Sequence, residues 1–587
     1  MPKLKPARSG STLAMSCKQH AQGTASAASA WVCVPSIRGV ALVVALASSG
    51  SCSAQSPHQE IPVDAANETG QAVVQTASLA GSSVSKPRAP RMTYYVRTDG
   101  GDASQCTGDT DAAYPGSGTG RACAWSHPFH ALSPDGTLRI DGGDTLLIGT
   151  GSYMIGPDAP GALGCVGRKC GLPPIPSGPS DNARTRVLGK SCSSKPQLWG
   201  SGGINSVVNL EGSSNVEIGC LEITDRDDCV HAHSDLAAKC RDGGNWARSG
   251  VLARRSANVR LHDLDIHGLA HSGINAGGLG DWIVERVRII ANGRAGWDGN
   301  VGEQGSANAG SMTLREIEIG WNGCGERWQD RTPWACWAQK TGGYGDGFGT
   351  RSTGGRWLIE DAHIHHNTSD GLDLLYLDGA DSTWVMIRRL HAVANAGNQV
   401  KVRGSATIEN SVIVGHCGYF KGKHFMVDGD LCRAGGNAVQ LALTPTASVN
   451  IRHNTITGEG GALIGAVKGG GNARVHVQNN VMVGFPAFHK RGILTDVFYA
   501  DDAVATLRWT GNLVWNVKGG ECPAGSICGR DPKLANMSLA SFDAQPLAGS
   551  PVLGQVPTPG GIGRDFRGRP RPMDGPSAIG AIELPTR

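Results

Sequence analysis

A short phrase of alternating apolar and polar residues recurs along the chain from about residue 215 onward. Within each copy the apolar residues return with a period of two, which is the spacing of a β-strand with one buried face. Units this short cannot each bury a hydrophobic core, so the copies are expected to stack into a solenoid. The copies are VEIGCLEI (216–223), VRLHDLDI (259–266), WIVERVRI (282–289), MTLREIEI (312–319), WLIEDAHI (357–364), ATIENSVI (406–413) and VNIRHNTI (449–456).

Asparagines mark the same place in several copies, at Asn292, Asn322, Asn367 and Asn395. Their intervals of 30, 45 and 28 residues fit coils of twenty-odd residues with one or two insertions. The strands are rich in β-branched residues and no helical segment separates them, so we expect an all-β, single-stranded right-handed parallel β-helix. A β-sandwich is the rival fold, but hairpin turn signals do not follow each strand. The 85 glycines and the aromatic content of 5% also favour tight turns between short strands.

The ends of the chain differ in composition from this repetitive part. Residues 38–54 (RGVALVVALASSGSCSA) have a positive charge, an apolar run too short to span a bilayer, and then small residues, which indicates an export segment over 1–54 and a secreted protein. Residues 55–90 are expected to form a flexible linker. The β-helix domain should then occupy 91–587, with a cap region at about 91–205 and a closing segment at about 516–587.

Charge and cysteine content support the same class of protein. Of the 54 basic residues, five lie in residues 1–54, so 49 basic residues face 50 acidic ones in the remainder, and nothing indicates a nucleic-acid partner. The remainder also holds 14 cysteines without paired CxxC spacings, which favours disulfides over zinc. The expected pairs are Cys106–Cys123, Cys165–Cys170, Cys192–Cys220, Cys229–Cys240, Cys324–Cys336, Cys417–Cys432 and Cys522–Cys528.

A second, shorter phrase aligns polar residues between coils. If each copy is the same strand of its own coil, Phe348, Leu372, Val400 and Val439 point inward together, and two columns of polar residues face solvent. The first column is Asp346, Asp370, Asn398 and Asn437, and the second is Gly349, Asp373, Lys401 and Gln440. The copies are SGINAG (272–277), DGFGTR (346–351), DGLDLL (370–375), NQVKVR (398–403) and NAVQLA (437–442).

This alignment predicts a catalytic site. Because neighbouring coils lie about 4.8 Å apart, Asp346, Asp370 and Asp373 would form one acidic patch suited to Ca²⁺, with Lys401 beside Asp373. Calcium bound there could offset the carboxylate of a uronic acid and acidify its C5 proton. Lys401 could remove that proton if its pKa is lowered, while Arg351 or Arg403 holds a carboxylate. The alternative without catalytic function is a solvated polar face in which Asp-Gly pairs serve only as turns.

The stretch NTSDGLDLLY (367–376) followed by GNQVKVRG (397–404) resembles the calcium-dependent pectate lyases of polysaccharide lyase family nine. The resemblance implies a pectate-lyase-like solenoid in which Asp346, Asp370 and Asp373 are calcium ligands and Lys401 is the catalytic base. Two residues depart from the family pattern. Ser369 stands where a further Asp ligand is expected, and Gln399 replaces a glycine beside the base. The tail 563–584 resembles the closing segment of secreted β-helix proteins.

An aromatic insertion precedes the first Asp strand. Trp328, Trp334 and Trp337 lie in a loop that the Cys324–Cys336 pair should close, and they are expected either to stack on sugar rings or to form a small loop core. His363, His365 and the adjacent His366 lie on one strand, but histidines are common on solvent faces, so metal binding by them is not favoured.

The sequence thus predicts a secreted, monomeric polysaccharide lyase that acts on an acidic polysaccharide with Ca²⁺ and has no membrane span. Two alternatives from other classes remain. One is another carbohydrate enzyme on the same fold, either a hydrolase, which needs two carboxylates near the substrate, or a C5-epimerase. The other is a non-catalytic polysaccharide-binding surface protein.

Overall fold

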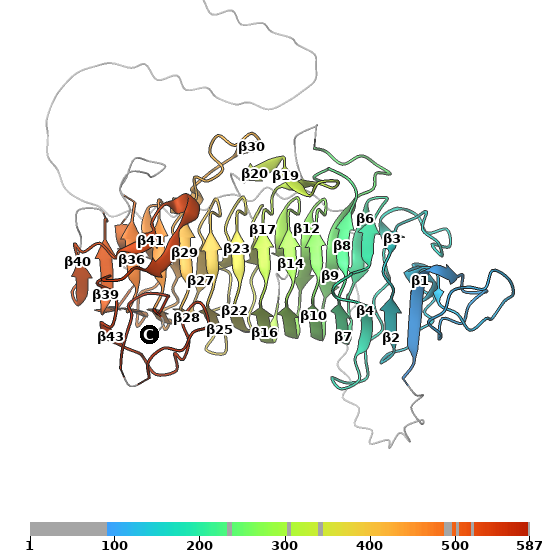
Figure 1. Ribbon diagram of the computed structural model, residues 1–587, viewed down its shortest axis with the longest axis horizontal. Coiled ribbons are helices and arrows are strands. Elements are labelled where there is room, and N and C mark those ends of the chain that lie inside the picture. Colours follow the sequence, from blue (N-terminus) through green and yellow to red (C-terminus); the bar gives the residue numbers. More distant parts are fainter. Residues whose placement is uncertain are drawn as a thin grey trace, which may run out of the picture. The chain divides into compact units, whose positions relative to one another are not determined.

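The computed structural model describes residues 91–231, 238–301, 307–338, 344–485, 496–500, 504–517, 522–573 and 575–584. The export segment and linker expected over 1–54 and 55–90 lie outside these residues. Lys86–Arg587 is one compact unit built on three long parallel sheets, to which successive coils add one strand each (Figure 1). The chain is therefore an all-β parallel β-helix, as the repeated phrase predicts.

The first sheet has thirteen strands. They are β1 (Thr93–Gly101), β2 (Thr145–Ile148), β4 (Thr185–Gly189), β7 (Ser214–Gly219), β10 (Ala257–His262), β13 (Gly280–Glu285), β16 (Ala309–Arg315), β22 (Arg356–Glu360), β25 (Trp384–Arg388), β28 (Ser405–Glu409), β32 (Ser448–Arg452), β35 (Arg474–Gln478) and β38 (Thr506–Thr510).

The second sheet also has thirteen strands. They are β3 (Ser152–Ile155), β5 (Gln197–Gly200), β8 (Glu222–Asp225), β11 (Asp265–His267), β14 (Arg288–Ile290), β17 (Glu318–Gly320), β23 (His363–His365), β26 (His391–Val393), β29 (Val412–Gly415), β33 (Thr455–Gly458), β36 (Val481–Gly484), β39 (Asn512–Trp515) and β40 (Ser526–Cys528).

The third sheet has ten strands. They are β6 (Ile204–Asn209), β9 (Ala247–Arg254), β12 (Ser272–Gly277), β15 (Ala295–Gly299), β21 (Phe348–Thr350), β24 (Leu372–Leu374), β27 (Val400–Arg403), β31 (Val439–Ala442), β34 (Ala462–Val467) and β37 (Asp496–Ala500).

Small elements decorate this frame. The short strands are β18 (Gly325–Arg327), β19 (Thr332–Trp334), β20 (Cys336–Ala338), β30 (Met426–Gly429), β41 (Leu534–Asn536), β42 (Asp543–Pro546), β43 (Val556–Pro557) and β44 (Pro576–Ser577). The 3-10 helices are η1 (Pro128–His130), η2 (Gly167–Lys169), η3 (Arg433–Gly435) and η5 (Leu539–Ser541). Among the residues described, no helix is long and apolar enough to cross a membrane.

Apolar side chains fill the space between the sheets. Trp297 and Phe348 of the third sheet have ring centroids 5.1 Å apart, and they contact Trp282 and Trp357 of the first sheet at 6.0 and 5.6 Å. All four rings are buried. Because large rings bury much area and prefer tilted or edge-to-face contacts, they fix the coils on which the polar columns lie.

The corner between the first and second sheets is made by one residue with a left-handed backbone in each successive coil. At Asp263, Arg286, Glu316, Asp361 and Arg389 the φ angle is 52° to 53°. Residues other than glycine adopt this region at a cost, so its repetition shows that coil geometry imposes it. The corner carries no glycine signature and was not foreseen from the sequence.

The second corner holds the four asparagines that mark the repeat. Asn292, Asn322 and Asn367 each donate Nδ2 to the Oδ1 of the next asparagine in the series, at 2.9, 2.9 and 2.7 Å. Asn395 ends the series by donating to Gln399 Oε1 at 2.8 Å. Each side chain is completely buried. Gln399, which replaces a glycine beside the predicted base, folds back and closes this asparagine ladder.

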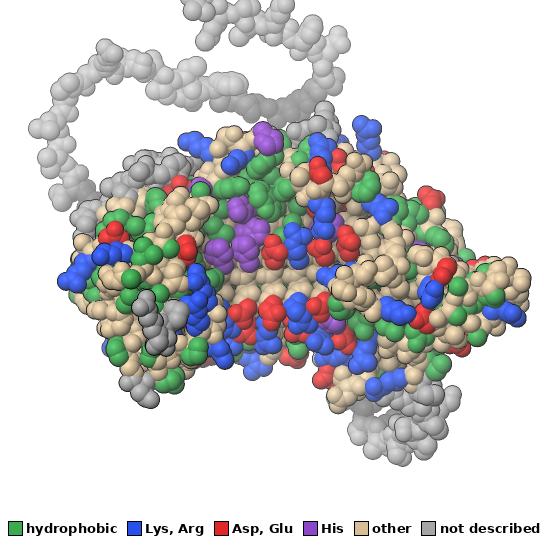
Figure 2. All heavy atoms as spheres, viewed as in Figure 1, with side chains coloured by type: hydrophobic (Ala, Val, Ile, Leu, Met, Phe, Trp, Pro, Cys, Tyr) green, Lys and Arg blue, Asp and Glu red, His purple; other side chains and the backbone are tan. Residues whose placement is uncertain are grey.

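Charged side chains cover the outer face of the first sheet. Arg260 lies between Glu217 and Glu285 of the neighbouring strands, at 2.9 and 2.5 Å, and Figure 2 shows acidic and basic side chains in rows on the surface. Pairs across neighbouring strands of this kind each contribute modestly to stability. These rows place basic side chains beside acidic ones, in keeping with the near balance of charge in the β-helix.

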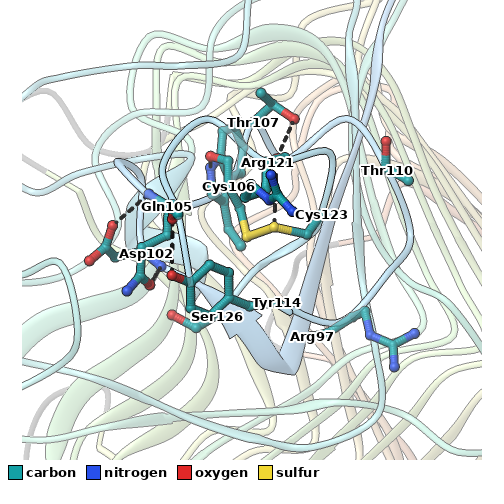
Figure 3. The surroundings of a disulfide bond; sticks show 12 residues. Arg97, Asp102, Gln105, Cys106, Thr107, Thr110, Tyr114, Arg121, Cys123 and Ser126 are labelled. Atoms are coloured by element: carbon teal, nitrogen blue, oxygen red, sulfur yellow. Dashed lines mark hydrogen bonds between the residues drawn. A yellow bond between two sulfur atoms is a disulfide. The ribbon is translucent and has the colours of Figure 1, made fainter. Parts of the chain in front are cut away.

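Seven disulfides close loops along the coils, and all seven predicted pairs are confirmed. Cys106–Cys123 lies in the N-terminal region shown in Figure 3, where Asp102 Oδ1 accepts the backbone N–H of Gln105 at 2.9 Å. At the other end Arg571 is buried and pairs with Glu583 at 2.8 Å. Arg571 Nε also donates to Asn410 Oδ1 at 3.0 Å, which ties the closing segment to the coils.

Candidate active site on the third sheet

The predicted register of the aligned strands and of the second polar column is confirmed. Phe348 pairs with Leu372, which pairs with Val400, and Asp373 stands between Gly349 and Lys401 on consecutive strands. Lys401 in turn pairs with Gln440 on β31. The second column therefore runs along the outer face of the third sheet as the sequence alignment requires.

Lys401 lies between two carboxylates. Its Nζ donates to Asp370 Oδ2 at 2.9 Å and to Asp373 Oδ2 at 2.8 Å. Asp373 Oδ1 also accepts the backbone N–H of Leu375 at 2.8 Å, which holds the carboxylate in place. Charge-assisted hydrogen bonds of this length are among the stronger ones in proteins. Lys401 is thus in direct contact with two of the three acids that the sequence placed beside it.

The first column differs from expectation. Asp346, Asp370, Asn398 and Asn437 precede their strands, so they belong to the turn and not to the alternating outer face. Asp346 Oδ1 accepts the backbone N–H of Asp370 at 3.1 Å, and Asp370 Oδ1 accepts that of Asn398 at 2.7 Å. Asn398 Oδ1 accepts from Asn437 at 2.9 Å in the same way. We call this series of hydrogen bonds, in which each side-chain oxygen accepts a backbone N–H of the next coil, the turn ladder. It is the structural role of the Asp-Gly positions.

The cluster is also buried, whereas the sequence predicted side chains that face solvent. Asp346, Asp370, Asp373 and Lys401 are 7, 6, 5 and 8% exposed. Each has neighbours on the coils before and after it, and the carboxylates close over the ammonium group. Buried charges are costly unless they are paired, so three acids around one amine leave negative charge uncompensated.

Burial shifts the protonation of these groups. Burial, reinforced by Asp370 and Asp373, raises the pKa of Asp346 to about 7. Burial alone would lower the pKa of Lys401, but the carboxylates of Asp370, Asp373 and Asp346 outweigh it and hold that pKa above its ordinary value. Lys401 is therefore an ammonium group in this arrangement. The lowered pKa expected of a base is therefore not found at Lys401 in this arrangement.

The donor atoms fit a calcium ion. Asp346, Asp370 and Asp373 supply hard carboxylate oxygens, which Ca²⁺ prefers. The buried Ser369 hydroxyl adds a fourth oxygen. It makes no hydrogen bond of normal geometry to the residues described, although it lies near enough to Asp346 to help lower that carboxyl's pKa. A hydroxyl at this position keeps an oxygen donor where the family pattern has a carboxylate.

The two predicted arginines flank the cluster in solvent. Arg403 is exposed at the end of β27, two residues beyond Lys401. Arg351 is exposed just after β21, where its Nη1 donates to Asn300 Oδ1 at 3.2 Å. Their placement suits contacts with a ligand that lies across these strands.

The three tryptophans expected either to stack on sugar rings or to form a loop core differ in their surroundings. Trp328 is 42% exposed and lines a cavity of about 700 Å³. Trp334 lines the same cavity but is covered by the Arg327 guanidinium, 3.7 Å from its ring centroid. Trp337 makes an edge contact with Tyr344 at 4.5 Å between centroids. Trp328 is therefore the most accessible of the three for stacking, while the other two pack within the loop.

A basic column missed in the sequence leads along the third sheet toward the cluster. Arg248, His271 and Arg294 each precede one of the stacked residues Ser249, Ser272 and Ala295. Among the residues described, the half-buried Arg248 guanidinium has no ion pair or hydrogen bond, and burial and then Arg168 and Arg294 lower its pKa. The basic column could have been found from AGWDG (295–299), because this segment continues the series of aligned strands in the third sheet.

Comparison with known proteins finds only weak similarity, and only to solved structures. No protein-family model matches the chain, and no curated protein matches it. Similar solved structures include pectate lyase Pel9A, with 11% identity, a TM-score of 0.40, and coverage of 85% of this chain and 97% of that one. XylC in complex with xylose has 8% identity, a TM-score of 0.42, and coverage of 84% and 99%.

An alginate lyase from Paenibacillus sp. str. FPU-7 has 13% identity, a TM-score of 0.30, and coverage of 63% of this chain and 92% of that one. At such values these neighbours carry no argument about the reaction. The motif resemblance to polysaccharide lyase family nine therefore stays a prediction, and the chain's own residues have to carry the functional argument.

Proposed function

We propose that the protein is a secreted polysaccharide lyase that cleaves a pectate-like uronic acid polymer by calcium-assisted β-elimination, with Lys401 as the base. The observation that carries this proposal is a buried amine held between two carboxylates on consecutive strands, with a third carboxylate beside them. Seven disulfides fit an extracellular protein.

The turn ladder alone does not account for this charge. On later coils Asn398 and Asn437 accept the same backbone N–H hydrogen bonds as Asp346 and Asp370 do. An amide oxygen is therefore sufficient for the turn. Carboxylates at 346 and 370 add buried negative charge at a cost in stability, which indicates a use beyond structure.

Calcium held by these carboxylates would neutralise the C6 carboxylate of the substrate and acidify its C5 proton. Lys401, freed of its acidic partners, has a lower pKa and accepts that proton. The C5–H electrons form a C4–C5 double bond as the C4–O bond breaks, and the leaving oxygen takes a proton from water. Arg403 and Arg351 are placed to hold the carboxylates of neighbouring sugars.

One observation favours a hydrolase as a second candidate. Lys401 holds the pKa of Asp370 below its ordinary value although burial opposes it, whereas the pKa of Asp346 is raised to about 7. Two acids whose pKa values are pushed apart are the usual pair in glycoside hydrolysis. Chromatography of products from pectate, alginate and glycosaminoglycans separates the cases. A lyase leaves unsaturated uronate ends, a hydrolase leaves saturated ones, and absence of the former from every polymer would refute the proposal.

The basic column supports an anionic polymer as substrate. β9, which holds Arg248, and β27, which holds Lys401, are five steps apart in the third sheet, which is roughly 24 Å at the usual strand spacing. A chain of uronates laid along the sheet could therefore reach Lys401 while a distant carboxylate pairs with Arg248. That guanidinium is half-buried and makes no direct ion pair with the residues described, although the charge of Asp298 acts to raise its pKa, so an anion in contact with it would stabilise it.

We expect Arg248→Gln to raise KM for a long uronate polymer by about five- to tenfold, since a partly exposed charge-assisted contact is worth about 1 kcal/mol. kcat should change little because Arg248 lies far from the reacting atoms. Steady-state kinetics on polymer and on a disaccharide or trisaccharide measure the effect, which should vanish for the short substrates. Arg474→Gln on the first sheet is the control, and an equal rise in KM for both variants would contradict this role.

A further inference from the structure

A group of histidines lies on the outer face of the second sheet, away from the cluster on the third. Glu318 of β17, His363 of β23 and His391 of β26 are directly paired in register on consecutive strands. His365 follows two residues after His363, so both side chains point to the same face. Figure 2 shows histidine side chains gathered on this surface beside acidic and basic ones.

The nearest three of these groups converge. One ring nitrogen each of His363 and His365 and a carboxylate oxygen of Glu318 lie within 4.8 Å of one another. Glu318 Oε1 and His365 Nε2 are 3.2 Å apart. Two ligands bound to one tetrahedral zinc ion at about 2.0–2.1 Å are roughly 3.4 Å apart, so this pair already has a suitable separation. Two histidines at alternate positions of one strand, with a third ligand on the adjoining strand, form a three-ligand set.

Surrounding contacts orient these ligands. His365 Nδ1 lies 2.9 Å from His366 Nδ1, which leaves Nε2 directed at Glu318. Arg288 Nε donates to Glu318 Oε2 at 3.0 Å, which leaves Oε1 on the side of the histidines. Partners of this kind fix the tautomer and direction of metal ligands. The His391 ring stacks on His363 with centroids 4.8 Å apart, so a further imidazole is close at hand.

Two of the three groups, His363 and Glu318, have the protonation state that metal binding needs. Burial, with the neighbouring histidines, lowers the pKa of His363 to about 3. The His365 hydrogen bond lowers the pKa of Glu318 to about 2, against the effect of burial. Near neutral pH His363 is thus an uncharged imidazole and Glu318 a carboxylate, and neither has to lose a proton on binding.

We infer that Glu318, His363 and His365 form a binding site for a divalent transition metal ion of the zinc class. Imidazole nitrogens with one carboxylate suit Zn²⁺, Ni²⁺ or Cu²⁺, whereas Ca²⁺ takes oxygen ligands. The site is separate from the oxygen-rich cluster around Lys401. Sequence alone did not favour it because Glu318 is separated from His363 by the 45-residue coil, and only the register brings them together.

The test is zinc binding by the purified full chain, without a polyhistidine tag. Calorimetric titration with Zn²⁺, and metal analysis after dialysis, should give one zinc ion per chain. His365→Ala and Glu318→Gln should each weaken binding at least about tenfold. His476→Ala, which removes a histidine from the first sheet, should bind as the unsubstituted protein does.

Two readouts make the result decisive. Zinc should raise the thermal midpoint of the unsubstituted protein and of His476→Ala more than that of His365→Ala. Calcium-dependent cleavage of uronate polymer should be equal in all four proteins, so loss of this site and failure of the proposed function are distinguishable. Zinc binding that is absent, or undiminished in both His365→Ala and Glu318→Gln, would overturn the inference.

Discussion

Replacement of Lys401 by arginine is expected to lower kcat on a uronate polymer about 10³-fold, because a positioned general base contributes roughly 10²–10⁴. Arginine keeps a positive charge between Asp370 and Asp373, where the lysine now donates at 2.9 and 2.8 Å. It cannot act as a base, since its pKa stays above about 12. The variant should therefore fold and yet fail to produce unsaturated ends, as followed by ultraviolet absorbance.

Lys401→Ala should lose the same activity and, in addition, stability in the absence of calcium. Removing one partner from a buried pair costs about 3–5 kcal/mol, because the remaining charges are left unpaired. Lys468→Ala, at an exposed turn position, is the control and should match the unsubstituted protein. Retention of activity by Lys401→Arg within tenfold would remove Lys401 from the role of base.

The second large effect is expected in the asparagine ladder. Asn367 is completely buried. Its Oδ1 accepts from Asn322 N and Nδ2 at 3.1 and 2.9 Å, and its Nδ2 donates to Asn395 Oδ1 at 2.7 Å. Asn367→Ala leaves several buried polar groups without partners at about 1–3 kcal/mol each. We therefore expect a loss of about 3–5 kcal/mol in the free energy of unfolding.

Urea denaturation followed by circular dichroism measures this loss, with Asn182→Ala, at an exposed position, as the control. The ladder ends at Gln399, which lies two residues before Lys401. Its Oε1 also accepts the backbone N–H of Asn395 at 3.0 Å. Activity per folded molecule should therefore also fall in Asn367→Ala. A loss of less than about 1 kcal/mol would mean that water forms hydrogen bonds with the polar groups that Asn367→Ala leaves without partners. The ladder would then not be what ties the coils together.

The sequence predicts register well because the register follows from period-two alternation. Once Phe348, Leu372 and Val400 are aligned as inward residues, Asp373 and Lys401 must be neighbours, and they are. The disulfide pairs were predictable for a related reason, since most of the cysteines are close in sequence and lie within one coil. Short-range spacing is therefore sufficient for both.

Burial and protonation could not be obtained in this way. Asp346 and Asp370 each stand two residues before an inward residue, Phe348 or Leu372, so strand alternation would point them inward too. They precede their strands, however, and the alternation of side-chain direction holds only within a strand. Arg248, His271 and Arg294 recur at equal intervals of 23 residues, but the pairing of Glu318 with His363 depends on a coil of 45 residues. Insertions such as the aromatic loop set coil lengths, and their size has no local signal in the repeat.

The central claim is that the buried acids around Lys401 hold calcium and that catalysis depends on it. The most direct test is the rate of unsaturated uronate formation while calcium is titrated into chelator-treated protein at pH 8 and at pH 6. We expect no product without calcium, saturation of the rate as calcium is added, and a higher half-saturating calcium concentration at pH 6. At the lower pH Asp346, with its pKa near 7, is largely protonated and has lost the negative charge that would attract the ion. Undiminished product formation in excess chelator at both pH values would contradict the account.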